Sequence, residues 1–128
     1  MKTLPKWARE LNFDPIKPLL ESKVTAISYW VKHDLLDDPT SEPAKLRSSS
    51  EVTKIIKRQH RDGYWKSKSR NIEKHPAQNY DLLETFRYTN ILINLYGLTR
   101  QDPCIGKAVK YLFSCQSEEG DIRGIIGE

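Results

Sequence analysis

The sequence has few of the features that mark membrane, secreted or disulfide-bonded proteins. No stretch reaches the roughly 18 consecutive apolar residues that a membrane helix needs, and the first residues have no apolar core of the secretory kind. The only cysteines, Cys104 and Cys115, are 11 residues apart in one predicted helix. That spacing places them about 16 Å apart, which is beyond disulfide reach. We therefore expect reduced thiols, a cytoplasmic location and no membrane span.

Recognisable catalytic chemistry is also scarce. The sequence holds no nucleophile-with-base constellation, no glycine-rich phosphate loop and no nucleic-acid-binding motif. His33, His60 and His75 have no metal-ligand spacing among themselves. We predict no catalytic residue, no metal, no cofactor and no nucleic-acid partner.

What is present is a basic segment in an otherwise ordinary composition. The 128 residues are 38% apolar and 30% charged, typical of one soluble domain, with 21 basic and 17 acidic residues giving a net charge of +4. Eight of the basic residues fall within positions 54–74. Six of them form a candidate anion-binding patch: Lys57, Arg58, Arg61, Lys66, Lys68 and Arg70. The alternative is a solvated helix end, where basic side chains also complement the helix dipole.

Apolar periodicity predicts helices and no strands. Residues 1–21 are expected to be irregular, apart from a short helical turn opened by Asp14-Pro15. Residues 22–124 are predicted to form two antiparallel helix pairs, and residues 125–128 a truncated tail. The expected pairs are 22–36 with 43–59, and 81–96 with 103–117. Ser48 and Glu51 match a capping box, Gly97 suits a helix C-terminus, and Asp102 an N-cap.

The second predicted pair has the clearest core pattern. On helix 81–96, one face carries six residues expected in the core: Leu82, Phe86, Thr89, Leu92, Ile93 and Tyr96. Helix 103–117 has a similar stripe: Ile105, Ala108, Val109, Leu112 and Phe113. The opposite face of helix 81–96 is polar, with Glu84, Arg87, Asn90 and Asn94.

A motif at the end of a predicted helix nearly recurs. Gln59 and Gly63 are followed by Trp65, and Gln116 and Gly120 repeat the same spacing 57 residues later. A glutamine amide at a helix end can bind the following loop and the next helix. Glycine permits a sharp turn, and tryptophan supplies a large apolar cover. A unit of one helix, a polar turn and a second helix that recurs at this length indicates stacked helix pairs.

This motif resembles the glutamine–tryptophan motif of the squalene cyclase and prenyltransferase repeat. The resemblance covers about residues 22–124 and implies an all-α fold of the α/α toroid type, in which these residues join helices and do not catalyse. The second copy departs from the pattern, because Ile122 stands where tryptophan is expected. Two pairs make only an incomplete ring, so the chain is expected to be a truncated product, an expressed fragment or a short array that self-associates.

The family's catalytic motifs have weak counterparts in this chain. Asp34, Asp37 and Asp38 do not match the spacing of the cyclase acid, and Asp102-Pro103-Cys104 matches a prenyltransferase zinc pair only locally. The toroid's inner helices line a central cavity. Its polar and aromatic lining would here be Glu84, Arg87, Tyr88, Asn90 and Asn94. The alternative is a solvent-facing stripe with a Glu84–Arg87 pair.

Two functions follow from the sequence. The first is a non-catalytic binding or interaction module, acting on a protein partner, on a second copy, or on an isoprenoid-like apolar ligand. The alternative is a fragment or divergent relative of a terpenoid cyclase or prenyltransferase whose catalytic residues lie outside this chain. A fold resemblance by itself does not establish either activity.

Overall fold

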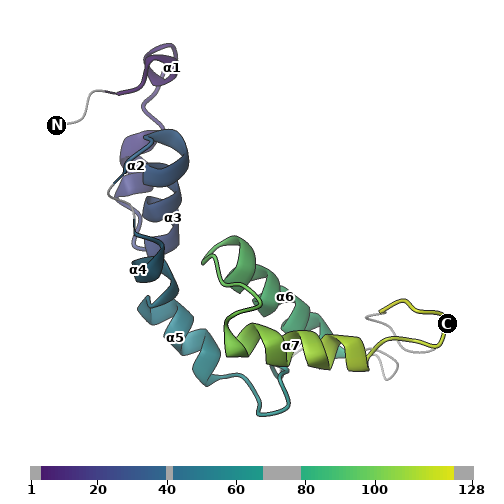
Figure 1. Cartoon of the computed structure of the whole chain (residues 1–128). Coiled ribbons are helices and arrows are strands. Elements are labelled where there is room, and N and C mark those ends of the chain that lie inside the picture. Colours follow the sequence, from purple (N-terminus) through teal and green to yellow (C-terminus); the bar gives the residue numbers. More distant parts are fainter. Residues whose placement is uncertain (1–3, 40–41, 68–78, 123–128) are drawn as a thin grey trace. The chain divides into compact units, whose positions relative to one another are not determined.

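The chain folds into helices that divide into two compact units. The structure, a computed structural model, describes residues 4–39, 42–67 and 79–122. The units comprise residues 1–49 and 50–128, and Figure 1 labels their helices. The described residues hold no strand, only a single antiparallel bridge between Gln116 and Ile122. The prediction of an all-α fold is therefore confirmed. No helix in the described parts is long and apolar enough to cross a membrane.

The first unit is built of short helices. They are α1 (Lys6–Arg9), α2 (Ile16–Leu20), α3 (Thr25–Trp30), the wider-wound η1 (Val31–Leu35) and α4 (Pro43–Arg47). Ala8, Ile16 and Val31 form a small buried cluster. The helical turn expected after Asp14-Pro15 is present as α2, and the Asp14 carboxylate accepts from the Ile16 N–H at 2.9 Å. The turn α1 was not expected in a segment predicted to be irregular.

The first long helix changes its winding midway. The helix predicted over residues 22–36 is present as α3 followed directly by η1. In η1 the Leu36 N–H donates to the Val31 carbonyl, five residues back, at 3.1 Å, which is the π-helical pattern. Asp37 follows in a left-handed conformation, with φ of +48°. The helix thus ends at the Asp37-Asp38-Pro39 segment, as the sequence predicts.

The second unit contains α5 (Ser50–Lys57), α6 (Tyr80–Asn94) and α7 (Pro103–Ser114). The unit boundary falls at Ser49–Ser50, within the predicted helical segment 43–59. Ser48 does not act as the expected capping-box residue, because α5 begins only at Ser50 and the Ser48 hydroxyl donates to the Ala44 carbonyl at 2.8 Å. Ser48 therefore closes α4 instead of opening α5.

The connection between α6 and α7 is a tight, well-bonded turn. Gly97 has φ of +71°, and the Leu98 N–H donates to the Leu92 carbonyl at 3.0 Å. This is the glycine-terminated helix end predicted at Gly97. Asp102 occupies the N-cap position of α7, but its carboxylate accepts from the Thr99 N–H at 2.8 Å instead of from the helix.

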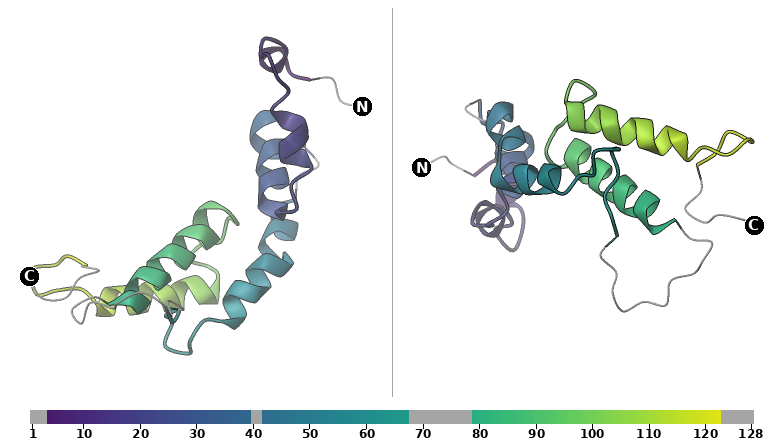
Figure 2. Two further views of the ribbon diagram at one scale, coloured as in Figure 1. Left: turned by 180° about the vertical axis from the view of Figure 1, so that it is seen from behind. Right: turned by 90° about the horizontal axis from the view of Figure 1, so that it is seen from below.

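Helices α6 and α7 pack side by side and antiparallel, as Figure 2 shows. Six residues of the two predicted stripes are buried between or beneath them: Leu82, Thr89, Leu92, Tyr96, Ile105 and Ala108. Three others were wrongly predicted as core: Phe86, Ile93 and Phe113 are 63%, 40% and 61% exposed. The apolar stripes are wider than the contact between two helices, so one flank of each extends beyond the part that its described neighbours cover.

Candidate interaction site at the repeated turn

The first copy of the motif forms a compact turn after α5. The Gly63 N–H donates to the His60 carbonyl at 2.9 Å, and the His60 N–H donates to the Tyr64 carbonyl at 2.8 Å. Gln59 closes the loop, because its side-chain amide donates to the Gly63 carbonyl at 3.0 Å. Gly63 has φ of +99°, a conformation that favours glycine.

The first turn is docked on α7. The same Gln59 amide donates to the Cys104 carbonyl at 2.9 Å. A Cβ atom at Gly63 would lie 2.1 Å from the Lys107 carbonyl oxygen, so only glycine permits this approach. The Tyr64 ring centroid lies 5.1 Å from that of Tyr111. The glutamine and the glycine therefore bring the turn against the backbone of α7.

Trp65 fixes the same turn to α5 and α6. Its side chain is 1% exposed, and its indole N–H donates to the Ile55 carbonyl at 2.8 Å. Its backbone N–H donates to the Thr85 hydroxyl oxygen at 2.9 Å, and its ring lies 5.6 Å from the ring of Tyr88. With Gln59 and Gly63, it makes the first turn the joint of three helices.

The second copy has the same internal bonds, but no described helix covers it. The Gln116 amide donates to the Gly120 carbonyl at 2.5 Å. The Ser117 N–H donates to the Asp121 carbonyl at 2.7 Å, and the Gly120 N–H to the Ser117 carbonyl at 3.0 Å. Gly120 has φ of +95°, yet among the described residues its hypothetical Cβ would meet only the Gln116 amide nitrogen, at 3.8 Å. Ile122, at the tryptophan position, is 43% exposed.

An apolar groove lies beside the second turn. It has a volume of about 390 Å³. Its lining comes from α6, α7 and the end of the turn: Leu82, Leu83, Phe86, Leu112 and Ile122. The groove includes Phe86, one of the residues that the sequence places in the core and the structure leaves exposed. The second turn and the exposed apolar residues of the groove therefore lie next to each other.

The structure brings together two members of the predicted anion-binding patch. Arg58 and Lys66 line a pocket of about 250 Å³ with Trp65 and Ser67. The Arg58 guanidinium donates to the Tyr88 hydroxyl at 2.8 Å and lies over its ring, 5.1 Å from the centroid. The other described members, Lys57 and Arg61, are exposed and do not line this pocket. Lys68 and Arg70 lie outside the described residues.

The predicted cavity-lining stripe divides into two environments. Arg87 and Glu84 form a salt bridge of 3.0 Å, and the Asn94 amide donates to the Asn90 carbonyl oxygen on the exposed face. The hydrogen bond that the Arg87 guanidinium donates to the Glu84 carboxylate raises the pKa of Arg87. Tyr88 is 8% exposed and packs against Trp65, and the Arg87 guanidinium lies over its ring, 4.5 Å from the centroid. The prediction that these residues line a cavity stays a prediction.

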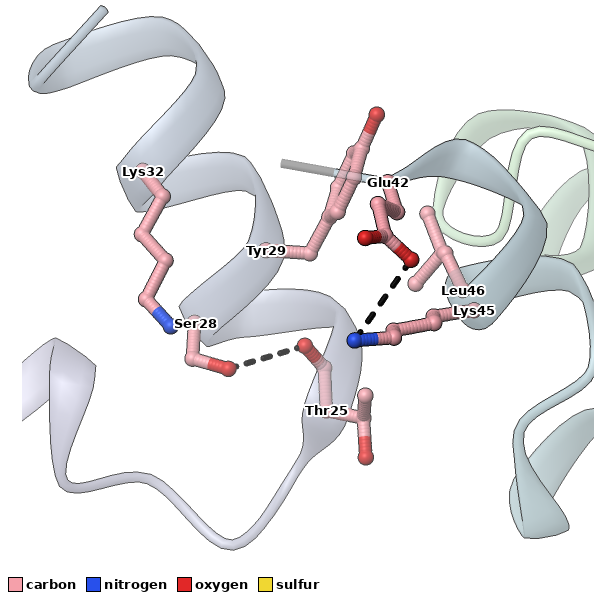
Figure 3. Close-up of a pocket in the computed structure, with 7 residues that line it drawn as sticks. All are labelled: Thr25, Ser28, Tyr29, Lys32, Glu42, Lys45 and Leu46. Atoms are coloured by element: carbon pink, nitrogen blue, oxygen red, sulfur yellow. Dashed lines mark hydrogen bonds and ion pairs between the residues drawn. The ribbon is translucent and has the colours of Figure 1, made fainter. Parts of the chain in front are cut away.

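A pocket in the first unit, lined mostly by residues with polar side chains, was missed by sequence reasoning. It has a volume of about 380 Å³ between α3 with η1 and α4 (Figure 3). Its lining residues are Thr25, Ser28, Tyr29, Lys32, Glu42, Lys45 and Leu46. Lys45 forms a 3.4 Å salt bridge with Glu42, and the Ser28 hydroxyl donates to the Thr25 carbonyl at 3.0 Å. The polar spacing Thr25, Ser28, Tyr29, Lys32 on one helix face could have indicated it.

Burial shifts the pKa of two groups on α7. Burial raises the pKa of the Cys104 thiol and raises that of Tyr111 to about 12. Across the part of the chain that the structure describes, no three His, Cys, Asp or Glu residues are grouped as a metal site. Comparisons with protein-family models, curated proteins and solved structures find no match for this chain.

Proposed function

We propose that this protein is a helical-repeat interaction module, in which the second turn and the adjoining groove bind another helix pair. The observation that carries the proposal is the contrast between two turns with the same hydrogen bonds. The first is docked on α7 through Gln59 and Gly63, whereas no described helix covers Gln116 and Gly120. A docking element used within the chain is thus presented a second time.

The groove supplies an energetic reason for binding. Phe86 and Ile122 line the groove and are 63% and 43% exposed. Burying one large apolar side chain contributes about 1.5–3 kcal/mol. A helix pair that covers the groove would therefore gain from apolar burial, and the turn would orient it through main-chain contacts.

We also propose that the repeated turn belongs to a repeat of the prenyltransferase and squalene cyclase kind, and that the helix pairs form part of an incomplete α/α toroid. The role of Gln59, Gly63 and Trp65 as a helix joint agrees with the structural role that this resemblance implies. The terpenoid-enzyme alternative needs catalytic residues from outside the chain, and no observation on the described residues favours it.

Extending the chain by one repeat tests the proposal. Residues 66–122 would be appended directly after Ile122, so that the second turn is followed by a copy of α6 and α7. The readout is the change in melting temperature that Gly120→Ala causes. In the original chain a Cβ at Gly120 would meet no backbone atom of the described residues. In the extended chain the added Cβ should meet the Lys107 carbonyl of the appended copy. Gly120→Ala should then lower the melting temperature as much as Gly63→Ala does.

The control for this experiment is Ser114→Ala, a change on the exposed end of α7 that should act equally in both chains. An equal effect of Gly120→Ala in the original and the extended chain would show that the second turn does not receive a helix pair, and the proposal would fail.

The apolar lining of the groove favours a second candidate function, the binding of an isoprenoid-like ligand. Leu82, Leu83 and Phe86 present apolar surface of the kind that an isoprenoid chain contacts. Titration with farnesol, followed by methyl NMR shifts of Leu82 and Leu112, tests this candidate. Phe86→Ser should abolish saturable shifts, and their absence in the unmodified chain would reject the candidate.

A further inference from the structure

We infer that the partner of the second turn is a second copy of this chain, and that residues 116–122 of one copy dock in the pocket between α3 and α4 of another. The inference rests on the proposed function, since it takes the second turn as a docking element. It adds the identity of the partner and the surface that receives the turn.

On the first helix of each pair, residues at the same intervals lie on one face. In the second unit, the docked first turn and the residues after it contact α6 at positions i, i+4 and i+7: Asp81, Thr85 and Tyr88. The pocket of the first unit is lined at the same spacing along α3 and η1: Thr25, Tyr29 and Lys32. Residues at these intervals lie on one helix face, so α3 offers a face of the same length as the one that holds the first turn.

The second helix of each pair repeats the correspondence. The first turn approaches α7 at positions i, i+3 and i+4: Cys104, Lys107 and Ala108. The pocket is lined at the same intervals by Glu42, the residue before α4, and by Lys45 and Leu46 of α4. The pocket in Figure 3 thus offers residues at the intervals that the first turn contacts on α7.

Charge distinguishes the second turn from the first and suits it to this pocket. Residues 116–122 carry three acidic residues, Glu118, Glu119 and Asp121, and no basic residue. The first turn carries Arg61 and Asp62, whose opposite charges cancel. The pocket presents two lysines against one glutamate. Opposite charges across an interface favour the correct partner and speed its encounter, so the acidic turn fits the lysine-bearing pocket.

The arrangement makes the contact head to tail. Turn and pocket are different surfaces, and each copy carries one of each. An interface of this heterologous kind continues from copy to copy and yields a ring if the rotation closes or a filament if it does not. The mass distribution in solution should therefore extend beyond the dimer as concentration rises.

Charge reversal on each side, followed by mixing, tests the inference. The turn variant carries Glu118→Lys and Glu119→Lys, and the pocket variant carries Lys32→Glu and Lys45→Glu. Sedimentation velocity on the full chain should give concentration-dependent association for the unmodified protein and a monomer for each variant alone. An equimolar mixture should associate again, because each reversed surface then meets an opposite charge on the other variant.

A matched control carries Lys6→Glu and Lys17→Glu, exposed changes of the same total charge away from the pocket, and should associate like the unmodified chain. Circular dichroism on every variant checks that the helices are retained. A monomeric unmodified chain, a variant that still associates alone, or a mixture that stays monomeric would each overturn the inference. The proposed function fails separately, on the Gly120→Ala comparison in the extended chain, which involves no second copy.

Discussion

Gly63 lies so close to Lys107 that a methyl group on its Cα would come within 2.1 Å of the lysine carbonyl oxygen. Gly120, its counterpart 57 residues later, has nearly the same φ, but no backbone atom of the described residues lies near the corresponding position. The two glycines share a conformation and differ in their surroundings. That difference separates the cost of backbone strain from the cost of losing a helix contact.

The glycine pair gives the first prediction. Gly120→Ala should lower the free energy of unfolding by about 1 kcal/mol, the cost of a left-handed conformation for a residue with a Cβ. Gly63→Ala should lower it by about 3 kcal/mol, because steric overlap with α7 adds to the same strain. Urea unfolding of both variants measures the difference. Equal losses would mean that the first turn is not held against α7.

A second prediction concerns the glutamines. Gln59 donates to the carbonyls of Gly63 and Cys104, whereas the described hydrogen bond of the Gln116 amide goes to the Gly120 carbonyl of its own turn. Gln59→Leu should cost about 2 kcal/mol, since it leaves two partly buried carbonyls without this donor, and Gln116→Leu should cost about 0.5 kcal/mol. Thermal unfolding compares the two variants. A larger loss for Gln116→Leu would contradict the assignment of the docked and undocked copies.

The third prediction is a loss of stability in alkali. Burial raises the pKa of Tyr111 to about 12, above the ordinary value of 10. The folded state thus favours the neutral phenol, and the contribution is complete below pH 10. It falls as the pH rises from 10 to about 12, where the unfolded chain ionises first. Melting temperatures between pH 9 and 11.5 should fall less steeply for Tyr111→Phe than for the unmodified chain. Parallel curves would refute this role.

The fourth prediction separates the two thiols. Cys104 is buried, and burial raises its pKa, whereas Cys115 is only half-buried. Because the thiolate is the reactive form, Cys104 should react with a disulfide reagent about ten times more slowly than Cys115 at pH 8. Single Cys→Ser variants assign the two phases. If Cys104 reacted in the fast phase, the start of α7 would have to open easily.

The helices of the second unit follow from the sequence because local rules agree there. Asp102-Pro103 marks the start of α7, Gly97 ends the preceding helix segment, and the apolar residues recur at helical intervals. In the first unit, local rules are less decisive. Neither the short turn α1 nor the change of winding at Val31 has a marker in the pattern of residues.

Periodicity identifies an apolar face but does not say what covers it. Phe86 and Phe113 satisfy the helical pattern as fully as Leu92, which is wholly buried. Their exposure depends on which helices meet those flanks, and that is a tertiary property. For the same reason, the sequence identified Gln116 and Gly120 as a motif without revealing that no described helix covers them. The pocket between α3 and α4 was missed because residues from separate helices form it.

The internal bonds of the second turn have a consequence for the kinetics and cost of association. Gln116, Ser117 and Gly120 hold the loop in its shape through their own hydrogen bonds, with none of the described helices packed on it. A binding surface of this kind loses little conformational entropy when it is covered, because its main chain is ordered beforehand. The association rate should then be governed by diffusion, orientation and charge, with no slow rearrangement of the loop.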